Sequence, residues 1–193
     1  DLSPAVSDCF AGWRDIAERL RGVAGGKRTT VCVECYPGVF VEDVERALKE
    51  ALAPACVIRS ADCFLEPPEI ERLVAKNLTD DPVFGRLNGI RIEDFFAPEK
   101  LAGARRAAAD VNEGLILIVG TGAVAVEPRP DVLVYADMAR WEIQQRQRAG
   151  EIGNLGAANR GETPSRQYKR GFFVDWRVAD RVKKKLLPWL DFL

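Results

Sequence analysis

The sequence contains no histidine. Histidine is the side chain whose pKa lies closest to neutral pH, and it is a common ligand of zinc. Its absence excludes Ser-His-Asp and Cys-His catalysis, acid–base chemistry by imidazole, and the zinc sites that use histidine. We therefore expect no metal ion and no other cofactor within this chain.

Cysteine is also scarce, and its spacing is uneven. An odd number of cysteines falls in segments where strands and helices are expected, which is typical of buried thiols in a reducing compartment rather than of a disulfide framework. This pattern predicts a cytoplasmic location. The five cysteines are Cys9, Cys32, Cys35, Cys56 and Cys63.

The chain lacks an excess of charge of either sign. Its 28 basic and 29 acidic residues give a net charge of −1, so no overall field favours nucleic acid or an anionic membrane surface. No apolar run approaches the ~20 residues of a membrane span, and the first residues do not resemble a signal peptide. We expect neither a nucleic-acid partner nor a membrane association.

The remaining composition, 47% hydrophobic and 30% charged, is typical of one soluble domain over residues 1–193. Apolar runs alternate with amphipathic helical patterns, beginning with a helix over residues 3–23. This alternation predicts a three-layer, doubly wound α/β fold with a mainly parallel sheet of about five strands. The expected strands are residues 29–35, 55–60, 114–120, 131–137 and 172–175.

The first strand leads through a short turn, residues 36–40, into an amphipathic helix. In an α/β protein this is where a phosphate-binding loop lies. The turn has one glycine and no lysine, serine or threonine, so it lacks the groups with which a phosphate loop holds phosphate. Tyr36 and Gly38 remain candidate ligand-binding residues. The pair Gly26-Lys27 precedes the strand instead of following it, and we interpret it as the end of the first helix.

Cys32 and Cys35 form a CxxC pair within the first strand. Residues three apart on an extended strand point to opposite faces of the sheet. We therefore predict one thiol in the core on each face, and no shared metal or disulfide.

Two further candidates follow other strands. Asp62 comes directly after the second strand, and Thr121-Gly122 forms a small-residue turn after the strand 114–120. Because the carboxyl ends of parallel strands meet at one edge of the sheet, Asp62 is the best candidate for a general base, and the turn is a candidate ligand-binding loop. A cap for the following helix is the alternative role for Asp62.

Basic residues gather in the second half of the chain. Residues 150–171 hold five glycines and several cations, a composition that fits either a mobile lid over an anionic ligand or a solvated surface loop. Asp80-Asp81 with Arg86 and Arg91 form a second candidate corner, oxygen-rich or phosphate-binding, and ordinary turn chemistry of Asp-Asp-Pro is the alternative. The candidate phosphate-binding arginines are Arg86, Arg146, Arg148, Arg166 and Arg170.

The order of these features resembles the P-loop nucleoside kinases of the uridine kinase type. The segment 60–64 (SADCF) resembles the strand end that carries the catalytic base. The segment 117–122 (LIVGTG) resembles a later core strand, and 134–137 (VYAD) followed by arginines resembles the last strand and lid helix. The resemblance implies a P-loop NTPase fold with Asp62 as base. The altered phosphate loop argues against phosphoryl transfer.

A closer resemblance covers nearly the whole chain. The segments VECYPGVFVEDV, LTDDPVFGR, RIEDFFAPEKL and YADMARWEIQQRQRAGEIGNLG are similar to the N-terminal region of bacterial class I mannose-6-phosphate isomerase-like proteins. That family implies carbohydrate metabolism, with a zinc-binding isomerase site in a cupin domain that follows the kinase-like domain. This chain lacks the histidines of that site, and its apolar last residues, 189–193, fit a domain cut from a longer protein.

Three hypotheses follow. The first is a degenerate kinase-like domain associated with mannose-6-phosphate isomerase. This domain would bind a phosphosugar or nucleotide weakly, or it would serve as a scaffold. A cupin domain or another partner would pack on its C-terminal end. The second is an active small-molecule kinase with an atypical phosphate loop. The third is a purely structural interaction domain.

Overall fold

The computed structural model describes residues 9–87 and 89–193. This part of the chain contains a sheet of four parallel strands in the order β2-β3-β1-β4. The strands are β1 (Arg28–Cys35), β2 (Cys56–Arg59), β3 (Gly114–Gly120) and β4 (Val132–Ala136). In the register of the central strands, Val31 lies between Leu117 and Val132. The predicted α/β class with a parallel sheet is therefore confirmed.

Helices cover both faces of the sheet. The α-helices of the described chain are α1 (Gly12–Val23), α2 (Val41–Leu52), α3 (Pro67–Leu78), α4 (Pro98–Ala109), α5 (Ala123–Val126), α6 (Arg140–Arg148), α7 (Pro164–Arg170) and α8 (Trp176–Leu186). Residues of α1 and α2 pack on one face, and residues of α3, α4, α5 and α8 pack on the other. The continuous apolar runs of β1 and β3 are explained by this burial on both sides.

The two thiols of the CxxC pair lie on opposite faces, as predicted. Cys32 belongs to the core beneath α3, α4 and α8, whereas Cys35 belongs to the core beneath α1 and α2. Both side chains are buried, and burial raises the pKa of each thiol. The pair therefore serves packing rather than metal binding.

The predicted fifth strand is wrong. Residues Gly171–Asp175 form a π-helical turn that joins α7 to α8, so the described chain has four strands instead of about five. The local sequence FFVD resembles a strand because it is aromatic and β-branched. Val174, Val178 and Val182 nevertheless recur every four residues, and this helical stripe packs into the core against the sheet.

The boundaries of the first helix also differ from the prediction. The predicted start near Ser3 lies outside the described residues, and α1 begins at Gly12. It ends at Val23, just before Gly25-Gly26, as predicted. Lys27 lies next to the amino end of β1, and its carbonyl accepts a hydrogen bond from the Gly114 N–H. The Gly-Lys pair therefore lies at the amino edge of the sheet, opposite the carboxyl ends of the strands.

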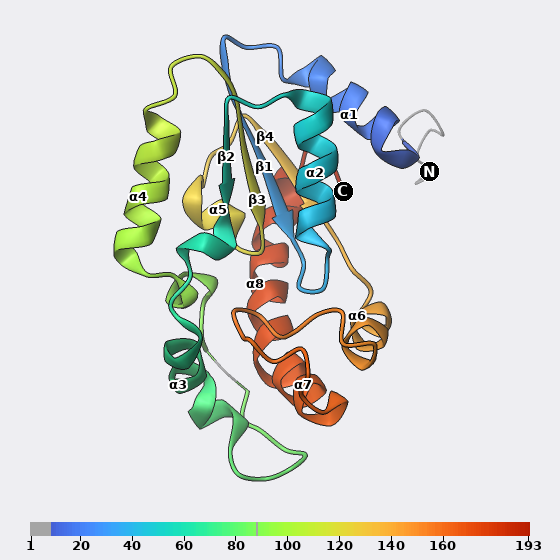
Figure 1. The fold of residues 1–193 in the computed structure, drawn as a ribbon, viewed down its shortest axis with the longest axis vertical. Coiled ribbons are helices and arrows are strands. Elements are labelled where there is room, and N and C mark those ends of the chain that lie inside the picture. Colours follow the sequence, from blue (N-terminus) through green and yellow to red (C-terminus); the bar gives the residue numbers. More distant parts are fainter. Residues whose placement is uncertain (1–8, 88) are drawn as a thin grey trace.

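The carboxyl ends of the strands face a second group of elements. Figure 1 shows α3, α6, α7 and part of α8 gathered beyond the end of the sheet to which the strand arrows point. The connection from β1 leads to β2 on one side, and the connection from β3 leads to β4 on the other. Connections that diverge in this way leave space at the carboxyl edge.

No helix in the described residues has the length and apolar character that a bilayer span requires.

Candidate functional site

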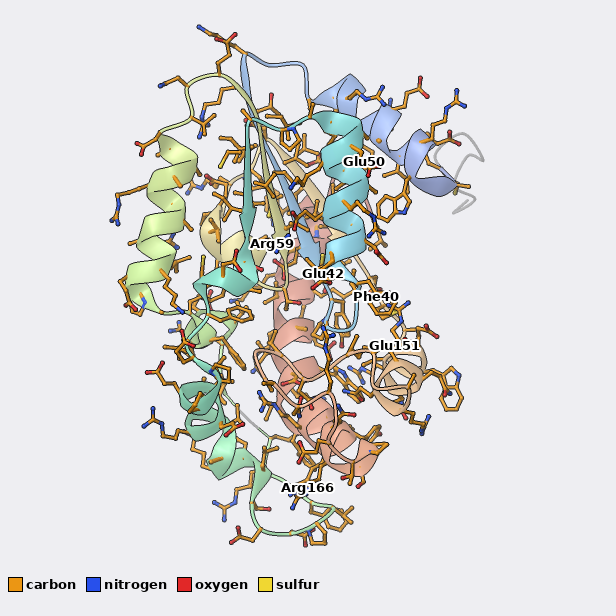
Figure 2. All side chains as sticks on the ribbon, viewed as in Figure 1. Phe40, Glu42, Glu50, Arg59, Glu151 and Arg166 are labelled. Atoms are coloured by element: carbon orange, nitrogen blue, oxygen red, sulfur yellow. The ribbon has the colours of Figure 1, made fainter. Side chains whose placement is uncertain are left out.

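A cavity of about 300 Å³ lies at the carboxyl edge of the sheet. Its walls come from the turn after β1 and the first turn of α2, from the residues after β2 and β3, and from the segment 151–160. We call this cavity the crevice. Figure 2 labels four of its lining residues: Phe40, Glu42 and Arg59 near the lower end of α2, and Glu151 next to α6. Ligands of parallel α/β proteins bind at this edge.

Three sequence-predicted site residues come together in the crevice. Gly38, Asp62 and Thr121 follow three different strands, and all three line this cavity. Asp62 lies in a 3₁₀ helix, Ser60–Cys63, directly after β2. The Ser60 hydroxyl donates a hydrogen bond of 2.9 Å to the Thr121 carbonyl, which joins the turns after β2 and β3. The meeting of parallel strand ends is the reason why sequence order alone could predict this group.

The turn after β1 is packed against α6. Gly38 has a φ of +97°, and a Cβ atom at this position would lie 2.7 Å from the Ile143 side chain. Arg146 donates from Nη1 to the Gly38 carbonyl at 2.8 Å, and its guanidinium carbon lies 3.9 Å from the centre of the Phe40 ring. Arg146 therefore holds the turn through a carbonyl oxygen, whereas a phosphate loop presents its N–H groups to a ligand.

Two predicted ligand-binding residues near the strand ends have other partners. Tyr36 is buried, and its hydroxyl donates to an oxygen of Asp180 at 2.8 Å. Burial raises the pKa of this phenol. The Gly122 N–H donates to a carboxylate oxygen of Glu34 at 2.7 Å. Neither Tyr36 nor Gly122 lines the crevice.

Glu34 was not predicted as a site residue, although it is central to this edge of the sheet. Its side chain is buried, and its second oxygen accepts a hydrogen bond from the Val124 N–H at 3.1 Å. Burial raises the pKa of Glu34 from 4.5 to about 7, while the backbone N–H donors lower it. The signal in the sequence was a single carboxylate inside the otherwise apolar strand 31–35.

None of the five predicted phosphate-binding arginines lines the crevice. Arg148 lines a separate cavity of about 460 Å³ between α6 and α7. Arg166 is exposed, pairs with Glu162 at 3.3 Å, and lies far below the crevice in Figure 2. Arg170 is buried beside Asp175. Arg86 is exposed, and its backbone, rather than its guanidinium, is bonded to Asn77. Arg146 holds the turn after β1.

The predicted lid-like loop, residues 150–171, is not a loop throughout. Its second half contains the helix α7, which begins at Pro164. Three residues of α7 are buried, namely Gln167, Lys169 and Arg170. The glycines and charges predicted a solvated segment, but these side chains hydrogen-bond to backbone carbonyls of neighbouring segments. Only the first half, residues 151–160, borders the crevice.

The charged groups of the crevice are mainly acidic. Its described lining includes Glu42, Glu45, Asp62 and Glu151, against two basic residues, Arg59 and Arg160. Arg59 and Glu45 pair with each other, and this pairing lowers the pKa of Glu45. No ion pair forms at the other four side chains within the described chain. No three acidic or cysteine side chains of the described residues are close enough to hold a metal ion.

Comparison with curated proteins and with solved structures finds no match. A family model does match, and it covers residues 12–193, which span every helix and strand described above. The chain therefore belongs to the family described as a domain of unknown function, DUF8485.

Proposed function

We propose that this domain binds a monophosphorylated sugar in the crevice and does not transfer phosphate. The observation that carries the proposal is the cavity at the carboxyl edge, where the turns after three parallel strands meet the segment 151–160. Its volume of about 300 Å³ is at the lower end of the ~300–1,000 Å³ range of ligand pockets. This size favours a single sugar over a nucleoside triphosphate.

The polar groups of the crevice support a sugar phosphate. Unpaired carboxylates at Glu42, Asp62 and Glu151 are acceptors for the hydroxyl protons of a sugar. Arg160 is the one basic residue of the described lining that forms no ion pair, and a guanidinium binds a phosphate group in a bidentate manner. Phe40 adds an aromatic wall.

The same groups argue against phosphoryl transfer from a nucleotide. Transfer depends on cations that neutralise the β- and γ-phosphates. The turn after β1 has no lysine, and the excess of carboxylates in the crevice repels a triphosphate more strongly than it repels the smaller charge of a single phosphate group. We accordingly propose a distant relationship to the P-loop nucleoside kinases, with a degenerate phosphate loop.

The proposal extends to the surroundings of the domain. All five cysteines are free thiols, which supports a cytoplasmic location. The similarity to mannose-6-phosphate isomerase-like proteins supports a role beside a cupin domain that carries zinc and the isomerase site. In that arrangement the present domain binds the phosphosugar or serves as a scaffold.

An active kinase is the second candidate, and the position of Asp62 favours it. Asp62 lines the crevice together with residues of the first turn of α2, where a catalytic base would face a phosphate acceptor. In that case ATP-dependent turnover of a sugar or nucleoside should be measurable, and Asp62→Asn should abolish it. If the crevice binds ligands without catalysis, neither the wild type nor Asp62→Asn shows ATP-dependent turnover.

A thermal-shift titration with mannose 6-phosphate, fructose 6-phosphate, unphosphorylated mannose and ATP–Mg²⁺ tests the proposal. A ligand at ~100 times its Kd stabilises the folded state by about 2.7 kcal/mol. For a chain of this length each kcal/mol raises the Tm by roughly 2–4 °C. A shift with the sugar phosphates alone supports the proposal, a shift with ATP favours the kinase, and no shift favours an interaction domain.

A further inference from the structure

The segment 151–160 forms one wall of the crevice without being a helix or a strand. Glu151, Ile152, Leu155 and Arg160 all line the cavity, together with two glycines of the same segment. A segment of this composition is either a mobile lid or a fixed wall, and its hydrogen bonds decide between the two. These bonds converge on one carboxylate, that of Asp175.

Asp175 lies at the end of the π-helical turn that precedes α8, and only 1% of its surface is exposed. Its Oδ2 accepts a hydrogen bond from the Asn154 side-chain amide at 2.7 Å and another from the Leu155 N–H at 3.2 Å. The other oxygen faces Arg170 Nε at 3.6 Å. Arg170 also donates to the Leu155 carbonyl at 2.8 Å. Asp175 and Arg170 thus hold the two backbone polar groups of Leu155.

A second set of bonds closes the segment on itself. Asn159 Oδ1 accepts a hydrogen bond from the Asn154 N–H, and Asn159 Nδ2 donates to Asn154 Oδ1, both at 2.9 Å. Gln167, which is fully buried in α7, donates to the Asn159 carbonyl at 2.8 Å. Asn154 further donates to the Gln167 carbonyl at 3.0 Å. The middle of the wall is therefore tied to the turn before α8 and to α7, and its second half is tied to α7.

We infer that Asp175 is a positioning residue for the crevice. Through Asn154 and Leu155 it fixes the segment 151–160 as a preformed wall, and through that wall it places Glu151 and Arg160. The inference rests on the proposed function insofar as it concerns ligand affinity, whereas the anchoring of the wall can be measured without ligand. Buried, hydrogen-bonded carboxylates that orient the residues of a site are a general device of binding sites.

Amide hydrogen exchange and ligand affinity, measured on Asn154→Ala, Asp175→Asn and the matched control Ser165→Ala, test the inference. Ser165 is exposed on α7, and its hydroxyl forms a hydrogen bond with the Thr163 hydroxyl, outside the segment 151–160. We expect slow exchange across residues 151–160 in the wild type. Both network variants should accelerate exchange there while leaving β1 and β3 protected. Their affinity for mannose 6-phosphate, measured well below the Tm, should fall by roughly tenfold or more.

Two results would overturn the inference. One is exchange of residues 151–160 at the rate of an unstructured chain in the wild type. The other is faster exchange in the variants with unchanged affinity for mannose 6-phosphate. A third result separates the two proposals. If neither the wild type nor the variants bind mannose 6-phosphate, but the variants lose amide-exchange protection across residues 151–160, the anchoring by Asp175 is supported and the proposed function fails. If Asp175→Asn does not fold, Asn154→Ala decides, because it leaves the Arg170–Asp175 pair intact.

Discussion

Glu34 and Gly122 join the two central strands of the sheet at their carboxyl ends. The Glu34 carboxylate, at the end of β1, accepts the Gly122 N–H at 2.7 Å from the turn after β3. This bond joins a buried titratable group to the residue that follows Thr121, which lines the crevice. We therefore expect the stability of the domain to depend on the protonation of a side chain that does not line the crevice.

The raised pKa of Glu34 predicts that stability falls as the pH rises. Burial raises this pKa from 4.5 to about 7, so between these values the folded state binds a proton that the unfolded state has released. The contribution is fully present below pH 4.5 and is lost as the pH rises through about 7, by roughly 3 kcal/mol in total. Urea unfolding from pH 5 to pH 8 measures it. The variant Glu34→Gln should lack this component, and an equal pH dependence in both proteins would contradict the assignment to Glu34.

Gly38→Ala should destabilise the domain by roughly 1–3 kcal/mol. The φ of +97° is unfavourable for alanine, and the new Cβ would lie 2.7 Å from the Ile143 side chain in α6. Gly161→Ala is the control, because a Cβ there meets no atom within 4 Å. Chemical denaturation of both variants gives the comparison. Equal stabilities would mean that the turn after β1 can move away from α6.

Arg146 and Arg166 offer a matched pair, because each forms an ion pair with a glutamate four residues earlier. The Arg146 side chain is 17% exposed, and it also binds the Gly38 carbonyl and stacks on Phe40. The Arg166 side chain is 74% exposed, and Glu162 is its partner. We expect Arg146→Ala to cost about 1–3 kcal/mol of stability and Arg166→Ala less than about 0.5 kcal/mol. Similar losses in urea denaturation would show that the contacts of Arg146 with the turn contribute little.

The sequence predicted the elements whose signals are local or follow from the topology of a parallel sheet. The apolar runs of β1 and β3 and the opposite orientation of Cys32 and Cys35 required only the period of a strand. The grouping of Asp62 with Thr121 required only that parallel strand ends meet at one edge.

The sequence could not predict the features that depend on tertiary packing. Val174 belongs to a helix because it continues a stripe of side chains that meets the sheet, although its immediate neighbours resemble a strand. The predicted arginines were chosen for their charge, but four of the five lie in α6 and α7, where Arg146 binds the Gly38 carbonyl and Arg170 the Leu155 carbonyl. Arg160 lines the crevice because a buried network positions its segment, and the partners of that network lie up to 21 residues apart in sequence.

The sugar-phosphate proposal predicts a specific loss of phosphate recognition in Arg160→Ala. If Arg160 binds the phosphate, its removal should weaken binding of mannose 6-phosphate by roughly 10- to 100-fold, the equivalent of one hydrogen bond to a charged group. Binding of unphosphorylated mannose, which depends on the carboxylates, should remain the same. Calorimetric titrations of both ligands into the wild type and Arg160→Ala measure this difference, and Arg148→Ala is the control because Arg148 lines a different cavity. A loss of affinity for both sugars in Arg160→Ala would mean that Arg160 supports the wall of the crevice instead of binding phosphate. Unchanged affinity for both would place the phosphate elsewhere, because Arg160 would then make no contact with it.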